Sequence, residues 1–149
     1  IYNEGGSYTL NDVTFLDNES YNGGGMLQVA SSSTSTFNNV TFSGNKGTLF
    51  GGGGFSSTGG SAVFTNVTFS GNAAPRGGAI HNHWISTPLL VNVAFYGNSA
   101  TNGGGIYNSY RSAPTLVNAI LWGDLPGEID VETYQVQRAA LASARGERR

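Results

Sequence analysis

The segment HNHW at His81–Trp84 holds both histidines of the chain. On an extended strand alternate residues share a face, so His81 and His83 could together bind a metal ion. A zinc site needs a third protein ligand, and the neighbouring sequence offers neither a carboxylate nor a third histidine. The tripeptide Ile80–Asn82, which overlaps the start of this motif, also aligns with Ile1–Asn3 and Ile106–Asn108, which places His81 at the position of Tyr2 and Tyr107. We therefore expect the motif to be structural and predict no metal site.

Carboxylates are the next candidates, because enzymes that cleave polysaccharides need acidic or basic side chains clustered on one face. Asp17 and Glu19 lie in one predicted turn, and Glu4 precedes them in the chain. In the aligned repeats Asp17 stands opposite glycines, so no column of acids forms. The sequence therefore predicts no catalytic residue. The alternative is a fragment of a polysaccharide lyase or hydrolase whose catalytic coils lie mostly elsewhere, with Asp17, Glu19 or Glu4 at its edge.

The composition argues against several other kinds of site. The chain has no cysteine, which excludes a disulfide framework and a catalytic thiol. Gly54–Ser61 resembles a phosphate-binding loop but has Gly60 in place of the lysine that such a loop requires. The net charge is −2, and the body of the chain has no basic stripe, so nucleic acid is not an expected partner. We also expect no cofactor and no membrane-spanning segment, since the apolar runs are short.

A repeat organises the chain. The heptapeptide NVTFSGN stands at Asn39–Asn45 and, unchanged, at Asn66–Asn72, and looser copies precede and follow it. The copies are spaced by 26 or 27 residues when aligned on their fourth letter, which falls at Phe15, Phe42, Phe69, Phe95 and Leu121. Within each copy apolar and polar letters alternate, which is typical of a strand with one buried face. Such a period with short strands and no helix predicts a right-handed parallel β-helix, a solenoid of about five coils.

Stacked coils place equivalent residues directly above one another, about 4.8 Å apart. We therefore expect two structural ladders: an interior aromatic column (Phe15, Phe42, Phe69, Phe95) and an amide ladder at a turn (Asn18, Asn45, Asn72, Asn98). We expect the valines two residues before each Phe to be interior as well. Glycine-rich tetrapeptides recur between the strands and predict a sharp, closely approached corner. One of them, at Gly52–Phe55, is delayed by two residues.

The residue after each aromatic of the interior column should point outward. This position is occupied in turn by Leu16, Ser43, Ser70, Tyr96 and Trp122. Tyr96 and Trp122 would thus lie on neighbouring coils, where exposed aromatic rings can stack on sugars or on a protein partner. They could equally cover the end of the solenoid. These two residues are the candidate binding site.

The paired motifs GGAI, at Gly77–Ile80, and FxxN, four times from Phe15–Asn18 to Phe95–Asn98, resemble those of the chlamydial polymorphic outer-membrane proteins. They also resemble, more broadly, the right-handed parallel β-helix repeats of bacterial surface proteins. The resemblance covers roughly residues 1–125 and implies an exported, adhesin-like segment of a larger chain. The last copy departs from the pattern, because it reads Leu121–Asp124.

These observations divide the chain into β-helix repeats at 1–125 and an irregular last coil with a basic, weakly helical or frayed tail at 126–149. We expect a non-catalytic structural and adhesive segment, located outside the cell or on its surface. Its expected partners are a glycan or a cell-surface protein and further coils of its own full-length chain. The chain shows no signal peptide at its start, and we expect it to be part of a longer protein.

Overall fold

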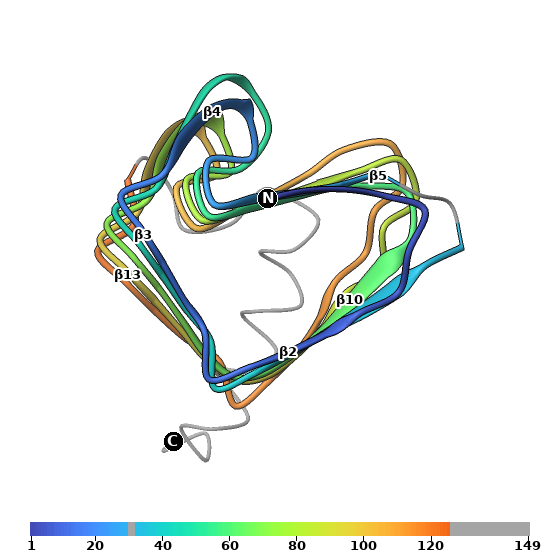
Figure 1. The fold of residues 1–149 in the computed structure, drawn as a ribbon. Coiled ribbons are helices and arrows are strands. Elements are labelled where there is room, and N and C mark those ends of the chain that lie inside the picture. Colours follow the sequence, from blue (N-terminus) through green and yellow to red (C-terminus); the bar gives the residue numbers. More distant parts are fainter. Residues whose placement is uncertain (30–31, 126–149) are drawn as a thin grey trace, which may run out of the picture.

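The computed structural model describes residues 1–29 and 32–125, which wind into a parallel β-solenoid of about five turns (Figure 1). In Figure 1 the chain runs clockwise from the blue first coil in front to the orange last coil behind, so the solenoid is right-handed. No helix in this part of the chain is long and apolar enough to cross a membrane. The prediction of an irregular coil and tail at 126–149 lies outside the described residues.

Three parallel sheets run along the solenoid axis, and each of the first four coils contributes strands to all of them. Sheet A is five-stranded and takes one strand from each coil: β1 (Tyr2–Glu4), β5 (Met26–Val29), β9 (Phe55–Thr58), β12 (Ile80–His83) and β15 (Ile106–Asn108). Sheet C takes one strand from each of four coils: β4 (Glu19–Asn22), β8 (Lys46–Phe50), β11 (Ala73–Arg76) and β14 (Ser99–Asn102).

Sheet B is eight-stranded and bends at a corner, so it forms two walls of the coil (Figure 1). In the middle coils single strands pass through the corner: β10 (Ser61–Ser70) and β13 (Leu89–Tyr96). In the other coils each wall has its own short strand: β2 (Thr9–Asn11), β3 (Thr14–Leu16), β6 (Thr34–Asn38), β7 (Thr41–Ser43), β16 (Thr115–Val117) and β17 (Ile120–Trp122). The corner residue has a positive φ in every coil, and it is always Asp or Asn, the non-glycine residues that tolerate this conformation best: Asp12, Asn39, Asn66, Asn92 and Asn118.

The predicted aromatic column is confirmed. Successive rings of Phe15, Phe42, Phe69 and Phe95 stack face to face, with centroids 4.6, 4.8 and 5.2 Å apart. The valines before them are buried, except that Val13 is only partly buried against the core. A second interior column, which the sequence analysis did not identify, runs beside the first: Leu10, Phe37, Phe64, Leu90 and Leu116.

The predicted amide ladder is also confirmed, and it continues one rung further. In each step the side-chain Nδ2 donates to the Oδ1 of the next coil, at 2.9 Å from Asn45 to Asn72 and at 2.9 Å from Asn72 to Asn98. The backbone N–H groups of Asn45 and Asn72 donate to the same acceptors. Asp124 forms the last rung, since its Oδ1 accepts from Asn98 Nδ2 at 2.8 Å. The copy that departs from the FxxN pattern thus keeps the ladder with a carboxylate.

The glycine-rich corner brings neighbouring coils into backbone contact, as predicted. A Cβ on Gly78 would lie 2.2 Å from the carbonyl oxygen of Gly104, and one on Gly53 would lie 2.3 Å from that of Gly78. Real Cβ atoms do not approach backbone atoms this closely. Glycine is therefore required here because the strands of sheet C meet those of sheet A with no space for a side chain.

Candidate functional site

The predicted binding pair lies where the sequence placed it. Tyr96 and Trp122 pair in register between β13 and β17, and both side chains are exposed, 61% and 71% respectively. Ile120, two residues before Trp122 on the same strand, is also exposed. We call Tyr96, Ile120 and Trp122 the aromatic patch.

The aromatic patch marks a change of surface along this wall of sheet B. The column that ends in Ile120 has threonine in its first three coils, and the column that ends in Trp122 has serine in its second and third coils. Apart from the exposed Leu16 of the first coil, large apolar side chains replace the short hydroxyl ones only in the last two coils. Besides Leu16, this otherwise polar wall therefore exposes an apolar surface in its last two coils that could contact a partner.

The two ladders, by contrast, offer little to a partner. The Phe column is buried throughout, and Asn45, Asn72 and Asn98 have no accessible surface, although Asn18 in the first coil is exposed. The FxxN motif thus supplies mainly buried contacts that join one coil to the next.

The acidic residues named from the sequence do not come together into one cluster. Glu4 lies in β1 of sheet A and accepts a hydrogen bond from the Tyr2 hydroxyl at 3.2 Å. Glu19 lies in β4 of sheet C, where it forms an exposed ion pair with Lys46 at 3.7 Å. Asp17 occupies the turn between β3 and β4. No group of three potential metal ligands occurs among residues 1–29 and 32–125.

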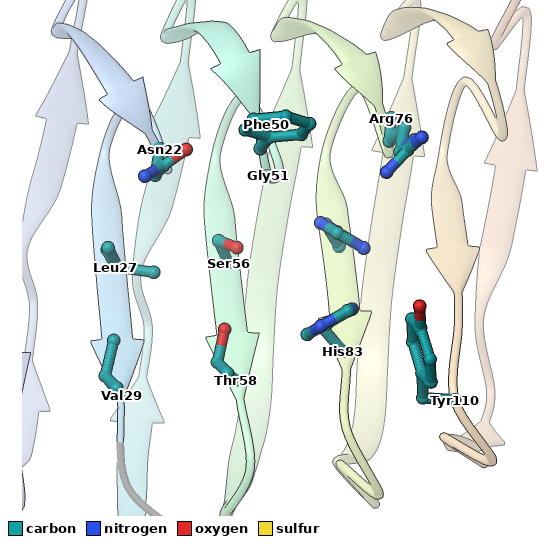
Figure 2. Close-up of a pocket in the computed structure, with 11 residues that line it drawn as sticks. Asn22, Leu27, Val29, Phe50, Gly51, Ser56, Thr58, Arg76, His83 and Tyr110 are labelled. Atoms are coloured by element: carbon teal, nitrogen blue, oxygen red, sulfur yellow. The ribbon is translucent and has the colours of Figure 1, made fainter.

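A second candidate site is a groove of about 430 Å³ on the outer face of sheet A, which we call the sheet A groove. Its floor is formed by β5, β9 and β12, and one side wall by the ends of β4, β8 and β11, as Figure 2 shows. The floor changes along the axis from Leu27 and Val29 through Ser56 and Thr58 to the two histidines of β12. An apolar end is therefore joined to a polar one.

The side wall is raised by the two extra residues that delay the second glycine motif. The register between β4 and β8 shifts, so that Ser20 pairs with Gly47 but Asn22 pairs with Phe50. In Figure 1 the corresponding teal loop reaches farther out than its neighbours. Phe50 is half exposed as a result, and its ring lies 5.8 Å from the Arg76 guanidinium carbon.

Arg76 carries the positive charge of the groove. Its guanidinium carbon also lies 6.0 Å from the ring centroid of Tyr107, so it is placed near two aromatic rings. Figure 2 shows Arg76 in one row with Asn22 and Phe50 along the wall. Within the part of the chain that the structure describes, no carboxylate lines the groove and Arg76 forms no ion pair.

The two histidines of the HNHW motif meet over one serine of the next coil. His83 Nδ1 lies 2.9 Å from Ser109 Oγ, and His81 Nε2 lies 3.2 Å from the same oxygen. His81 pairs in register with Tyr107, as the alignment predicted, and is 5% exposed. Its Nδ1 is buried and has no hydrogen-bond partner in the described structure.

Both imidazoles are neutral at pH 7. Burial, followed by the charges of His83 and Arg76, lowers the pKa of His81 to about 4. Burial and the charge of Arg76 lower the pKa of His83 as well. Among residues 1–29 and 32–125 no carboxylate contacts either imidazole to orient it as a general base, so the described residues do not complete a nucleophilic triad around the Ser109 hydroxyl.

Aromatic rings close the end of the groove beyond His83. The ring of His83 packs edge-on against Tyr110 at 4.7 Å, and Tyr110 lies 5.5 Å from Trp84. Trp84 and Tyr110 are both exposed and both have positive φ, at 59° and 53°. Large residues rarely adopt this conformation, and such backbone strain is concentrated at functional sites.

Sequence reasoning identified the HNHW motif but not the groove around it. It missed Phe50, Arg76 and Tyr110, which reach the groove from three different elements. One signal was present: the 26-residue spacing also aligns Trp84 with Tyr110, which predicts a ring pair on neighbouring coils.

Comparison with known proteins bears on the repeat. Residues 66–83 and 92–109, about a quarter of the chain, each match the family model described as a Chlamydia polymorphic membrane protein repeat. Each matched segment runs from the corner asparagine of sheet B through the ladder and glycine corner into sheet A. No curated protein and no solved structure matches the chain. The chain is therefore a parallel β-solenoid that carries repeats of the Chlamydia polymorphic membrane protein type, which confirms the resemblance read from its motifs.

Proposed function

We propose that this chain is a non-catalytic structural and adhesive segment of an exported surface protein, which presents exposed aromatic side chains to a glycan or a protein partner. The observation that carries the proposal is the aromatic patch. Its members occupy two columns whose earlier rungs are mostly short hydroxyl residues, so the change to large apolar side chains is local. The name of the matching repeat, a membrane protein repeat, supports a place at the cell surface.

The arrangement of the solenoid supports the structural half of the proposal. Each coil is joined to the next by parallel strand pairs, stacked phenylalanines and a buried amide ladder. Stability of such an array depends on contacts between neighbouring coils, so a stiff rod of any length can be built from the same unit. A rod of this kind holds its exposed loops and side chains at fixed spacing.

The test is binding to a glycan array and to intact cells, followed by a screen for lyase and hydrolase turnover. We expect binding without turnover, weakened roughly tenfold or more by Trp122→Ala or Tyr96→Ala, because exposed aromatic anchors carry much of the energy of an interface. Tyr21→Ala is the matched control, since Tyr21 is an equally exposed aromatic residue on β4 of sheet C. It should leave binding unchanged.

Two results would contradict the proposal. Turnover of a polysaccharide that is lost in Asp17→Asn would favour the enzymatic alternative. Binding to neither glycans nor cells would leave the adhesive role without support.

A further inference from the structure

The sheet A groove is positively charged and therefore suits an anionic ligand. Arg76 is the only charged side chain among the described residues that line it, and the two histidines beside it are neutral at pH 7 because burial and Arg76 lower their pKa values. The only ion pair among the described residues joins Glu19 and Lys46 and lies outside the groove lining. The guanidinium fork, held beside the rings of Phe50 and Tyr107, is free to bind a carboxylate with two parallel hydrogen bonds.

The rest of the groove suits a sugar. Hydroxyl groups of Ser56 and Thr58 line the floor and can both donate and accept hydrogen bonds. The imidazole of His83 also lines the floor, and because its Nδ1 is hydrogen-bonded to Ser109, its Nε2 is left to donate or to accept one bond. Tyr110 supplies a ring at one end of the groove, against which the C–H face of a sugar ring can stack, and Trp84 lies 5.5 Å from that ring, outside the groove lining. In Figure 2 the hydroxyl end of Tyr110 points to the side of the groove where Arg76 lies.

The floor does not suit an extended peptide. A peptide that binds to a sheet pairs with an open strand edge. β5, β9 and β12 are each paired on both sides, by β1 and β9, by β5 and β12, and by β9 and β15. The groove therefore offers side chains and no free main-chain edge.

We propose that the sheet A groove binds an acidic saccharide, with the sugar carboxylate on Arg76 and a sugar ring against Tyr110. The volume of about 430 Å³ is in the range of small-ligand sites. This proposal deepens the adhesive function and rests on it in one respect, that the partner is a saccharide. The two sites can be tested separately, because the groove lies on sheet A and the aromatic patch on sheet B.

The experiment is calorimetric titration of this chain with trigalacturonate and sialyllactose, and with cellotriose and lactose as neutral counterparts. We expect the acidic probes to bind and the neutral ones to bind about tenfold more weakly or not at all. Arg76→Gln should weaken binding of the acidic probes about tenfold or more, since it removes a charge-assisted bidentate contact. Tyr110→Ala should weaken binding of acidic and neutral probes alike.

Arg111→Gln is the matched control, since it removes one positive charge from an exposed residue outside the groove lining. It should change the affinity less than twofold, roughly the residual effect of a single screened surface charge. Arg76 is exposed, so the fold should survive its substitution, which thermal unfolding will check.

Three results would overturn the proposal. The first is that neither acidic probe binds at millimolar concentration, and the second is that Arg76→Gln binds the acidic probes as tightly as the unchanged chain does. The third requires an acidic peptide as a further probe: Arg76→Gln loses binding of this peptide but of no saccharide. If acidic probes bind and only Trp122→Ala weakens them, the groove proposal fails while the adhesive function stands. If Arg76→Gln abolishes binding on the glycan array while Trp122→Ala does not, the groove is the adhesive site.

Discussion

His81 lies at the floor of the sheet A groove between one cation and several neutral polar groups. Arg76 and His83 lie near it on the same coil, and Tyr107 lies near it on the next coil. Ser109, also on the next coil, is hydrogen-bonded to its Nε2. Desolvation is the largest cause of its lowered pKa, and the cation adds to it. The folded chain therefore holds this imidazole in its neutral form, whereas the unfolded chain protonates it near its usual pKa of about 6.5.

This difference predicts a loss of stability in mild acid. Between pH 6.5 and pH 4 His81 is mostly protonated in the unfolded state and mostly neutral in the folded state. The free energy of unfolding therefore falls as the pH is lowered. The fall attributable to His81 should approach about 3 kcal/mol at pH 4, at 1.36 kcal/mol per pKa unit.

The measurement is urea unfolding of the chain and of His81→Gln at pH 7, 5.5 and 4, where Gln keeps a polar side chain that does not titrate. Carboxylates titrate in both proteins, so the contribution of His81 is the difference between the two pH profiles. Parallel profiles would show that the imidazole is protonated in the folded state as readily as in the unfolded one.

At the scale of the element, asparagine residues form two separate ladders. The inner ladder at Asn45, Asn72 and Asn98 is buried and satisfies both side-chain and backbone groups, since Asn72 Nδ2 also donates to the carbonyl of Phe42 at 2.9 Å. The outer ladder on the sheet B corner is exposed, with longer hydrogen bonds such as 3.2 Å from Asn92 to Asn66. Burial therefore decides how much each ladder stabilises the fold.

We predict that Asn72→Ala lowers the free energy of unfolding by roughly 3–5 kcal/mol. The substitution removes the acceptor of the backbone N–H of Asn45 and of one of its two side-chain N–H groups, since the other donates to the Phe15 carbonyl, and it removes a donor to the carbonyl of Phe42. Each unsatisfied buried group costs about 1–3 kcal/mol.

Asn66→Gly is the control in the outer ladder. Glycine keeps the positive φ of 55° without strain, so only exposed hydrogen bonds are lost and the cost should stay below about 1 kcal/mol. Equal losses in the two variants, measured by chemical denaturation, would mean that the buried ladder contributes no more than the exposed one.

The elements were predictable where coils repeat and unpredictable where they differ. Phe42 and Phe69 could be placed inside because equal residues at a 27-residue spacing stack when strands are parallel. Arg76 could not be placed, because its position depends on the register shift in β8, which raises Phe50 above the groove, and on the side-chain conformation it adopts beside Tyr107. The alternation in NVTF says which side chains point outward, but it does not indicate how far a neighbouring strand projects over them.

At the scale of the whole molecule, stability depends on position along the axis. Phe69 stacks on Phe42 and on Phe95 and packs edge-on against Phe64, whereas Phe15 stacks on Phe42 alone. Both are nearly or fully buried, at 0% and 5% exposed. In a solenoid each coil contacts only its neighbours, so a central coil supports two interfaces and a terminal coil of the chain supports one.

Phe69→Ala should therefore cost roughly 3–5 kcal/mol of unfolding free energy, the range for a phenylalanine deleted from a packed core. Phe15→Ala should cost less by about 1 kcal/mol or more, because it removes one ring stack in place of two and each such pair contributes about 0.5–1.5 kcal/mol. Leu16→Ala, at an exposed position of the same coil, should cost less than about 0.5 kcal/mol. Urea unfolding of the three variants measures this order, and equal losses for Phe15 and Phe69 would show that the coils do not act through nearest-neighbour contacts alone. The expected order follows from the stacking itself: the interior column stabilises the rod through pairs of rings, and the number of pairs that one ring joins is set by the number of coils on either side of it.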